Sequence, residues 1–520
     1  MDLFRLLLLG SADLRQSAAA PVPKSYLAAV VSDQGARLIA VAAGLWLTPL
    51  ALSYLGRDAY GLFALTLSVI AWLSVIDLGT PAGLQVHLTQ VAAKGSAEEA
   101  SRYVSSAFMA QLVMSAVLLA VGVLGIAGFG RYFPVPREWA SDAAFLAGCL
   151  LLATVLRQPV RIESAILAAY HKVHFNHLVQ TVSVVVRVGC AVLLLARGWG
   201  LASLGIAHVT AVAVTALLST LLRRSLVPGV RFRPSLVSRD HLRKISRSGV
   251  WFSLGGLAGI LIVGADRVVA AKLLSLEAVT VLYLSSRLYG LAADLLAPIA
   301  ESARPTLGRL LGQGDHAEAH RVYRLVNRIS LSLAVVAALA IWAGNRTFVT
   351  AWVGPENYGG WALDAALALG LVARLAPLPS RAALASGLVV KSQTLVRLGE
   401  GALNLALSVA LTPLLGLAGV ALSTPLAAAL TSLWCLPRLA SRLFPLQRQM
   451  HRYSDGLAVA LLAVPLAGVA GWSRLAASQA GGYTGAALAM TITLAAGLTL
   501  IWWTGMKART RSALRRLLPA

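Results

Sequence analysis

Long apolar runs separated by short polar breaks dominate this chain. Most runs reach the roughly 20 residues that a helix needs to cross a bilayer, and the ten-residue alternation of membrane barrel strands is absent. The pattern therefore predicts an all-α, polytopic membrane protein with about 14 transmembrane helices. The run at residues 60–91 is too long for one simple span, so we expect a break at Gly79 and Pro81.

Composition supports a membrane protein and disfavours a nucleic-acid partner. The 520 residues are 58% hydrophobic and only 13% charged, whereas soluble domains are about 25% charged. The net charge is +24, but no polar segment is long enough to form a basic nucleic-acid-binding domain. The three cysteines lie in or near apolar runs without metal-ligand spacing, so we expect them to be packing residues.

The basic residues predict the orientation. About 31 Lys and Arg fall on one side of the predicted spans and about seven on the other, and such a bias marks the cytoplasmic side. Both termini are then cytoplasmic, and the number of spans is even. The longest loop on the opposite side covers about a dozen residues, 130–141, which leaves no room for a catalytic domain there.

An internal repeat predicts two lobes. A shift of 219 residues places Gly95–Arg102 on Gly314–Arg321, with a shared Gly-x-x-x-Glu-Ala-x-Arg pattern. Repeats of one topology imply two lobes around a central cavity that binds the substrate. The predicted parts are a cytoplasmic tail (1–32), an N-lobe of six spans (33–222), a basic cytoplasmic linker (223–247), a C-lobe of six spans (248–436), two extra spans (437–505) and a basic cytoplasmic tail (506–520).

Seven basic residues lie inside apolar runs, and all seven are arginine. They are Arg37, Arg157, Arg161, Arg187, Arg267, Arg287 and Arg374. A charge at the bilayer centre costs roughly 2.5–3.5 kcal/mol on insertion scales, so it must be paired, reach the interface or face a wet cavity. Because the planar guanidinium binds phosphate through two parallel hydrogen bonds, a cavity lined by these arginines would suit a phosphorylated anion.

Acidic residues in the same runs allow two roles. They could neutralise the arginines, or bind a proton or sodium ion and couple its movement to transport. The candidates for coupling or for lining the cavity are Asp77, Glu163, Asp266 and Asp294, and Asp364 and Glu400 are further candidates for pairing. Arg287 could pair with Asp294, and Arg397 with Glu400. His171, His174 and His177 have no carboxylate nearby, and we expect no metal site.

Several motifs resemble the polysaccharide-export flippases of the multidrug/oligosaccharidyl-lipid/polysaccharide superfamily. They are Leu-Gly-Arg-Asp-Ala-Tyr-Gly at 55–61, Asp-Leu-Gly at 77–79, Asp266-Arg267 at a helix end, Arg-Leu-Tyr at 287–289 and the Gly/Pro hairpin at 411–421. The resemblance implies alternating-access transport of undecaprenyl-diphosphate-linked oligosaccharides across the bacterial inner membrane, for exopolysaccharide, O-antigen or capsule biosynthesis. Arg37, Arg267 and Arg287 best match the family's cavity arginines.

Two other functions are open. A multidrug cation antiporter of the same superfamily would need an acidic cavity, and a membrane-embedded glycan polymerase or ligase would need a large extracytoplasmic loop. We expect no enzyme activity and no cofactor, and coupling to a proton, a sodium ion or the membrane potential is open. The expected partners are the lipid-linked oligosaccharide, membrane lipids, a glycan polymerase and chain-length proteins.

Overall fold

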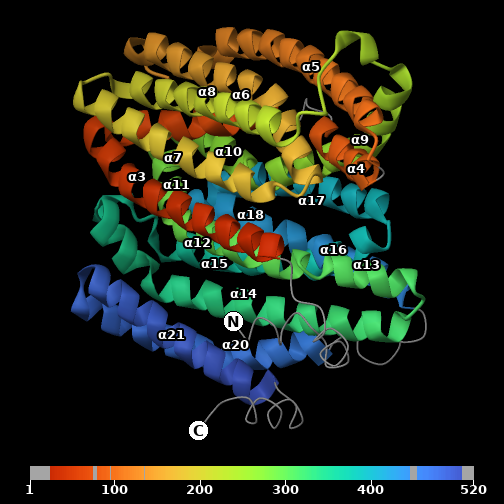
Figure 1. Cartoon of the computed structure of the whole chain (residues 1–520). Coiled ribbons are helices and arrows are strands. Elements are labelled where there is room, and N and C mark those ends of the chain that lie inside the picture. Colours follow the sequence, from red (N-terminus) through yellow and green to blue (C-terminus); the bar gives the residue numbers. More distant parts are fainter. Residues whose placement is uncertain (1–23, 74–78, 94, 134, 445–453, 506–520) are drawn as a thin grey trace. The chain divides into compact units, whose positions relative to one another are not determined.

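The computed structural model describes residues 24–73, 79–93, 95–133, 135–444 and 454–505. These residues are helical with short connections and contain no strand, which confirms the predicted all-α class (Figure 1). They divide into two compact units, which we call the first unit (described residues 24–280) and the second unit (described residues 281–505). The predicted tail at 506–520 and most of the tail at 1–32 lie outside the described residues, and the predicted lobe boundaries stay predictions.

The first unit contains eight α-helices and two short 3₁₀ helices within its described residues. They are α3 (Lys24–Leu73), α4 (Thr80–Ala93), α5 (Ala97–Tyr132), η3 (Arg137–Trp139), α6 (Ala140–Ala169), α7 (Val173–Ala196), α8 (Gly200–Leu226), η4 (Pro234–Leu236), α9 (Arg239–Val263) and α10 (Ala265–Leu273). Helix α11 (Leu276–Ser285) crosses the division between the units.

The second unit contains the remaining described helices. They are α12 (Arg287–Glu301), α13 (Arg304–Gly312), α14 (His316–Val353), η5 (Pro355–Asn357), α15 (Gly360–Leu375), α16 (Leu378–Ser386), α17 (Val390–Leu415), α18 (Leu417–Leu430), α19 (Ser432–Ala440), η6 (Ser441–Leu443), α20 (Ser454–Ala480) and α21 (Gly482–Gly505).

The helices agree with the predicted number of spans. Eleven helices in the described residues are long and apolar enough to cross a membrane. Three predicted spans are not counted separately among them. Helix α3 covers most of two predicted spans and has a kink at Gly56, where φ is 76°. Helices α11 and α12, separated at Ser286, lie where one span was predicted. Helix α20, which is 27 residues long, lies at another predicted span. The chain is a multi-pass membrane protein.

The repeat is visible in the helix boundaries. Helices α4 and α13 end, α5 and α14 begin, and α7 and α17 end at positions that differ by 219 residues in each pair. Gly95 and Gly314 both have positive φ, 72° and 77°. The next residues cap the helices: Ser96 Oγ and Asp315 Oδ1 accept the backbone N–H three residues later, at 3.3 and 3.0 Å. The shared motif is therefore a helix-start signal used twice.

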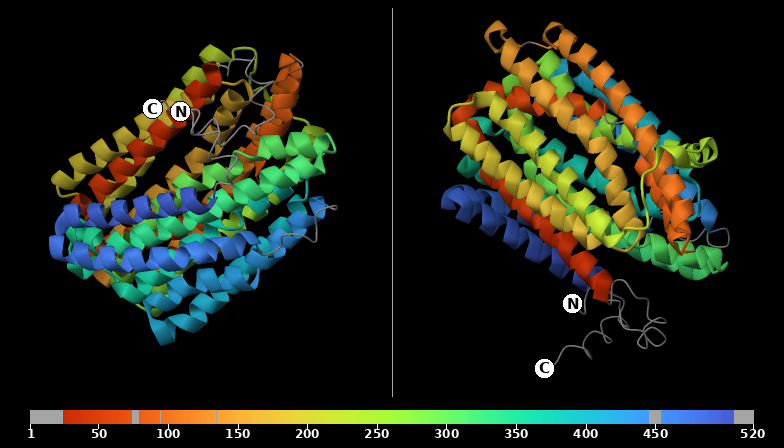
Figure 2. Two further views of the ribbon diagram at one scale, coloured as in Figure 1. Left: turned by 90° about the horizontal axis from the view of Figure 1, so that it is seen from below. Right: turned by 45° about the horizontal axis from the view of Figure 1, so that its top comes forward.

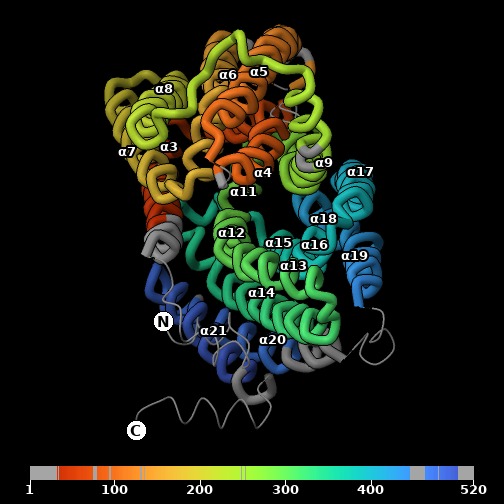
Figure 3. The backbone as a smooth tube through the Cα atoms, turned by 45° about the vertical axis from the view of Figure 1, so that its right-hand side comes forward, coloured from red at the N-terminus to blue at the C-terminus, as the bar shows by residue number. Residues whose placement is uncertain are grey.

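Packing in the first unit is built on α6 and α3. Helix α6 packs against α5 and α8, and α3 runs along α7 (Figure 1). A hydrophobic cluster at one end joins α4, α5 and α6 and includes Leu84, Leu88, Val104 and Ile162. The tube in Figure 3 shows the segment between α8 and α9 crossing the end of this helix group beside α5.

Helix α14 is the centre of the second unit. Its 38 residues carry α15 on one side and the α20–α21 pair on another, and the two C-terminal helices run along it in the views of Figure 2. Tyr289, Ile341, Leu371 and Leu375 form a buried cluster between α12, α14 and α15. Helices α20 and α21, predicted as two extra spans, therefore pack against the rest of this unit.

The predicted break after the second span is confirmed. Helix α3 ends at Leu73 and α4 begins at Thr80, while Gly79 between them has a φ of 65°. Pro81 lies in the first turn of α4, where its missing N–H costs no hydrogen bond. A Cβ on Gly79 would lie 2.2 Å from the carbonyl oxygen of Gly249 in α9. Glycine is therefore required here by both backbone conformation and space.

We predict that Gly79→Ala lowers the melting temperature much more than Gly95→Ala does. Both glycines have positive φ, which costs a residue with a Cβ roughly 1–2 kcal/mol. Gly95 has open space around its Cβ position, whereas Gly79 meets the α9 backbone. Thermal unfolding of the two purified variants in detergent measures the difference. Equal losses of melting temperature would show that α9 accommodates the added Cβ without a loss of stability.

Candidate functional site

Three of the predicted arginines come together in the first unit. Arg157 and Arg161 lie one turn apart on α6 and are exposed, and Arg187 on α7 is partly buried. The guanidinium of Arg157 is close enough to Arg161 and Arg187 for their positive charges to repel it. We call these three residues the first-unit arginine cluster. Like charges held together in this way attract an anion.

His208 and Phe63 lie beside this cluster. His208 on α8 is within electrostatic range of Arg187 and Arg157, and its ring centroid is 5.8 Å from that of Phe63 on α3. The Nδ1 atom of His208 lies 2.8 Å from the carbonyl oxygen of Leu204. Because a carbonyl only accepts, Nδ1 carries the proton and Nε2 is left as an acceptor in the neutral ring. Four helices, α3, α6, α7 and α8, thus converge on the cluster.

The carboxylate closest in sequence to these arginines is used elsewhere. Glu163 accepts from Arg223 Nε at 2.7 Å and Nη2 at 3.4 Å, and both side chains are only 12% exposed. Arg223 also donates to the carbonyl of Val230 at 3.2 Å. Arg157 forms no ion pair or hydrogen bond with any other described residue. An ion-coupling role for Glu163 stays a prediction, but its observed contact ties α6 to the end of α8.

Asp294 in the second unit pairs with a different arginine from the one that the sequence suggested. Arg374 Nη2 lies 3.6 Å from Asp294 Oδ1, and the side chains are 39% and 67% exposed. The predicted pairing of Asp294 with Arg287 is wrong, because seven residues rise about 10 Å along a helix. Arg287 instead lies over the ring of Tyr283, 5.9 Å from its centroid.

A mixed charge cluster surrounds Arg374. Arg381 on α16 and Arg397 on α17 lie within electrostatic range of each other, of Arg374 and of two carboxylates, Glu301 and Glu400. Glu400 is 6% exposed and lies close to the Ser432 side chain. We call these five residues with Asp294 the second-unit charge cluster. Acids offset its arginines, in contrast to Arg157 in the first unit.

Sequence reasoning missed Arg381 and Arg397 as members of a cluster. It placed both on the cytoplasmic side of their spans, although it identified Glu400 as a possible partner of Arg397. The signal that could have found them is the carboxylate at position 400, which lies inside an apolar run one turn after Arg397.

The other predicted residues have separate environments. Arg37 is exposed on α3. Arg267 on α10 donates to Ser68 Oγ on α3 at 3.1 Å. The Oδ1 atom of Asp266 is buried and has no hydrogen-bond partner among the described residues. Asp77 lies outside the described residues. The structure thus joins Arg157, Arg161 and Arg187, and separately Arg374 and Asp294.

A buried hydrogen-bond network around Asp364 was not predicted from the sequence. The Asp364 carboxylate on α15 is fully buried and is contacted by four side chains. Tyr289 Oη donates to Oδ1 at 2.6 Å, Asn345 Nδ2 to Oδ1 at 2.8 Å, Tyr358 Oη to Oδ2 at 3.0 Å and Arg474 Nη1 to Oδ2 at 3.1 Å. We call these five residues the Asp364 network. It links α20 to α12, α14 and α15.

Arg474 closes the Asp364 network from the C-terminal helices. Its guanidinium lies 4.7 Å from the centroid of the Trp342 ring and donates to Tyr358 Oη at 2.7 Å. Burial and then the negative charge of Asp364 raise the pKa of Tyr358, so this phenol stays neutral. The sequence marked Asp364 as a pairing candidate but assigned Arg474 only to the non-cytoplasmic end of its predicted span, 455–475. Because 110 residues separate Arg474 from Asp364 along the chain, no local sequence pattern indicated that they pair.

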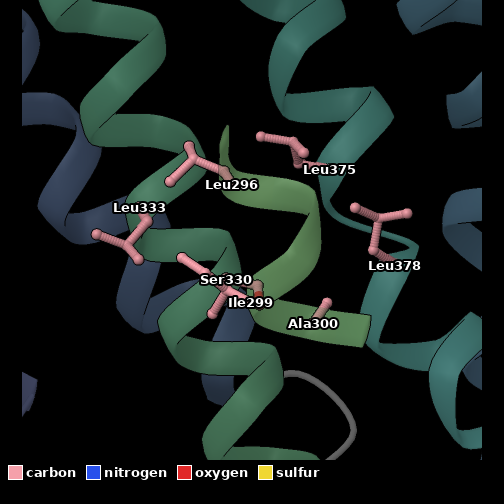
Figure 4. Close-up of a pocket in the computed structure, with 7 residues that line it drawn as sticks. All are labelled: Leu296, Ile299, Ala300, Ser330, Leu333, Leu375 and Leu378. Atoms are coloured by element: carbon pink, nitrogen blue, oxygen red, sulfur yellow. The ribbon is translucent and has the colours of Figure 1, made fainter. Parts of the chain in front are cut away.

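An apolar pocket in the second unit does not fit a charged ligand. Figure 4 shows its lining side chains, which come from α12, α14 and the α15–α16 region and are aliphatic except for one serine: Leu296, Ile299, Ala300, Ser330, Leu333, Leu375 and Leu378. None of the predicted arginines lines it. A phosphorylated headgroup would find no cationic partner there.

The fold is that of transporters of the multidrug/oligosaccharidyl-lipid/polysaccharide (MOP) superfamily. The structure superposes on an inward-facing multidrug resistance MATE family transporter with a TM-score of 0.66, 16% identity and coverage of 79% of this chain and 96% of that chain. It superposes on the lipid II flippase MurJ in an inward closed conformation with a TM-score of 0.67, 13% identity and coverage of 91% and 97%. At these identities the similarity defines the fold.

The family follows from the sequence match. Residues 36–311, more than half of the chain, match the model of the polysaccharide biosynthesis protein family, and the chain belongs to that family. It is also 26% identical over 424 residues to the uncharacterized membrane protein EpsK of Bacillus subtilis (strain 168), covering 78% of this chain and 81% of EpsK. The predicted family is thereby confirmed.

Proposed function

We propose that this protein is a flippase that moves undecaprenyl-diphosphate-linked oligosaccharides across the bacterial inner membrane during cell-surface polysaccharide biosynthesis. Its family takes part in polysaccharide biosynthesis, and its fold is shared with a lipid II flippase. The observation that carries the proposal is the first-unit arginine cluster, in which Arg157 and Arg161 are exposed on a mostly apolar helix and Arg161 and Arg187 act electrostatically on Arg157.

Electrostatics favours an anionic headgroup at this cluster. Arg161 and Arg187 both repel the guanidinium of Arg157, and an anion beside Arg157 would relieve this repulsion. A diphosphate offers several oxygens to planar guanidinium forks, and hydrogen bonds between charged groups are the strong ones. The same charges would repel a cationic drug, so this cluster disfavours the multidrug antiporter.

The remaining predicted residues have secondary roles in this proposal. Arg37, Arg267, Arg287 and Arg374 are candidates for contacts with the diphosphate or with acidic sugars as the headgroup moves. Asp77, Glu163, Asp266 and Asp294 are candidates for coupling to a proton or sodium ion. Asp266 is the most suggestive of the described acids, because a buried carboxylate oxygen without a partner favours proton or cation binding.

Ligand binding by the purified full-length protein tests the proposal. We expect undecaprenyl diphosphate to bind more tightly than undecaprenyl monophosphate, and ethidium, a cationic drug, to bind weakly or not at all. In cells, deletion of the gene is expected to remove a surface polysaccharide without changing ethidium sensitivity. Tight ethidium binding together with ethidium hypersensitivity of the deletion strain would contradict the flippase proposal and support a multidrug antiporter.

A further inference from the structure

The segment that joins α8 to α9, residues 227–238, is fixed against α5. We call it the strap. Three of its backbone N–H groups donate to serine hydroxyls of α5 at 3.0–3.2 Å: Arg231 to Ser101, Arg233 to Ser105 and Ser238 to Ser106. Serines at these positions form a polar stripe on α5 that receives an extended chain.

The flanks of the strap are anchored as well. Val227, Val230 and Ile245 are buried in the hydrophobic cluster of α4, α5 and α6. Arg223, just before the strap, donates to the carbonyl of Val230 and pairs with Glu163. Figure 3 shows the strap following the end of the helix group rather than extending away from it. Its backbone is therefore ordered before any ligand binds.

The strap and the start of α9 carry a dense positive charge. Residues 224–247 contain seven exposed basic side chains and one acidic side chain, Asp240. The basic residues are Arg224, Arg231, Arg233, Arg239, Arg243, Lys244 and Arg247. None of the seven forms an ion pair with a residue that the structure describes. This excess of positive charge on a fixed backbone attracts anions.

The direction of two arginines follows from their neighbour. The Phe232 ring packs on the Phe108 ring of α5, with 4.7 Å between centroids. Successive side chains of an extended segment point to opposite sides. We therefore expect Arg231 and Arg233 to lie on the side away from Phe108. Both are exposed, and Arg231 Nε donates to the carbonyl oxygen of Pro228 within the strap at 3.2 Å.

We propose that the strap and the first turns of α9 form a binding surface for anionic phospholipid headgroups of the adjacent bilayer leaflet. The strap joins two membrane-spanning helices, so chain connectivity keeps it near the bilayer surface. Clusters of four to eight Lys and Arg beside a span attract anionic lipids. An ordered backbone reduces the entropy lost on binding. This inference does not depend on the substrate of the transporter.

Lipid binding by the purified full-length protein tests the surface. Native mass spectrometry in a neutral detergent measures the affinity for phosphatidylglycerol and for phosphatidylcholine. We expect Arg231→Gln/Arg233→Gln to lower the affinity for phosphatidylglycerol about 30-fold, since each basic residue near an anionic surface contributes about 1 kcal/mol. Arg231→Lys/Arg233→Lys is expected to retain most of the affinity, because it keeps both charges.

The matched control is Arg309→Gln/Arg321→Gln, which removes two exposed charges from the second unit. We expect it to change the phosphatidylglycerol affinity less than threefold. The proposal is overturned if the wild-type protein binds both lipids equally, if the control loses as much affinity as the strap variant, or if inorganic phosphate displaces phosphatidylglycerol at equal concentration. The last result would identify a site for free phosphate rather than for lipid.

Discussion

Replacing Arg474 by methionine is expected to destabilise the protein by about 3–5 kcal/mol, the usual cost of leaving a buried charge without its partner. The Asp364 carboxylate has no exposed surface. In the variant it would keep the hydrogen bonds from Tyr289, Asn345 and Tyr358 but lose its cation. The ring of Trp342 would also lose its guanidinium neighbour.

Thermal and denaturant unfolding in detergent measure this loss. The double variant Arg474→Met/Asp364→Leu is expected to recover a large part of the stability, because it leaves no charge buried. Arg374→Met is the matched control, since its partner Asp294 is 67% exposed and such pairs contribute about 0–1 kcal/mol. If Arg474→Met and Arg374→Met have the same small effect, the Asp364 network does not hold α20 in place.

Replacing Arg157 and Arg187 by glutamine is expected to lower the affinity for undecaprenyl diphosphate by roughly 10- to 100-fold per residue. The reason is that a hydrogen bond between charged groups contributes about 1.5–3 kcal/mol. Arg157→Lys should fall between glutamine and the wild type, because it keeps the charge but loses the planar fork. Binding of the diphosphate to purified variants and complementation of a deletion strain measure these effects.

The stability of the same variants separates a binding role from a structural one. Arg157 is repelled by Arg161 and Arg187, so Arg157→Gln is expected to leave the melting temperature unchanged or to raise it. Loss of affinity with retained stability indicates a ligand site. Arg102→Gln is the control, because Arg102 is exposed and paired with Glu98 at 3.0 Å. Normal transport by Arg157→Gln and Arg187→Gln would remove the arginine cluster from the mechanism.

The sequence alone determined the class of the protein and the places where its helices begin and break. Apolar runs of the right length identified the spans, because a membrane requires each span to satisfy its own backbone hydrogen bonds. The break at Gly79 was predicted. The twin helix starts after Gly95 and Gly314 were not, although the shared motif, used only as evidence for a repeat, contains their signal. Each depends on local chemistry, a positive φ or a capping side chain, that the sequence states directly.

The tertiary structure decided which charges meet. The sequence identified Asp364, Glu163 and Asp294 as acids in apolar surroundings, but it could not show that their partners are Arg474, Arg223 and Arg374. Partners on different helices depend on how each helix is rotated and where it packs, and no short-range pattern records these two quantities. For the same reason, only the packing of α6 beside α7 and α8 showed that Arg157 is repelled by two other arginines, whereas acids lie among the arginines of the second-unit charge cluster.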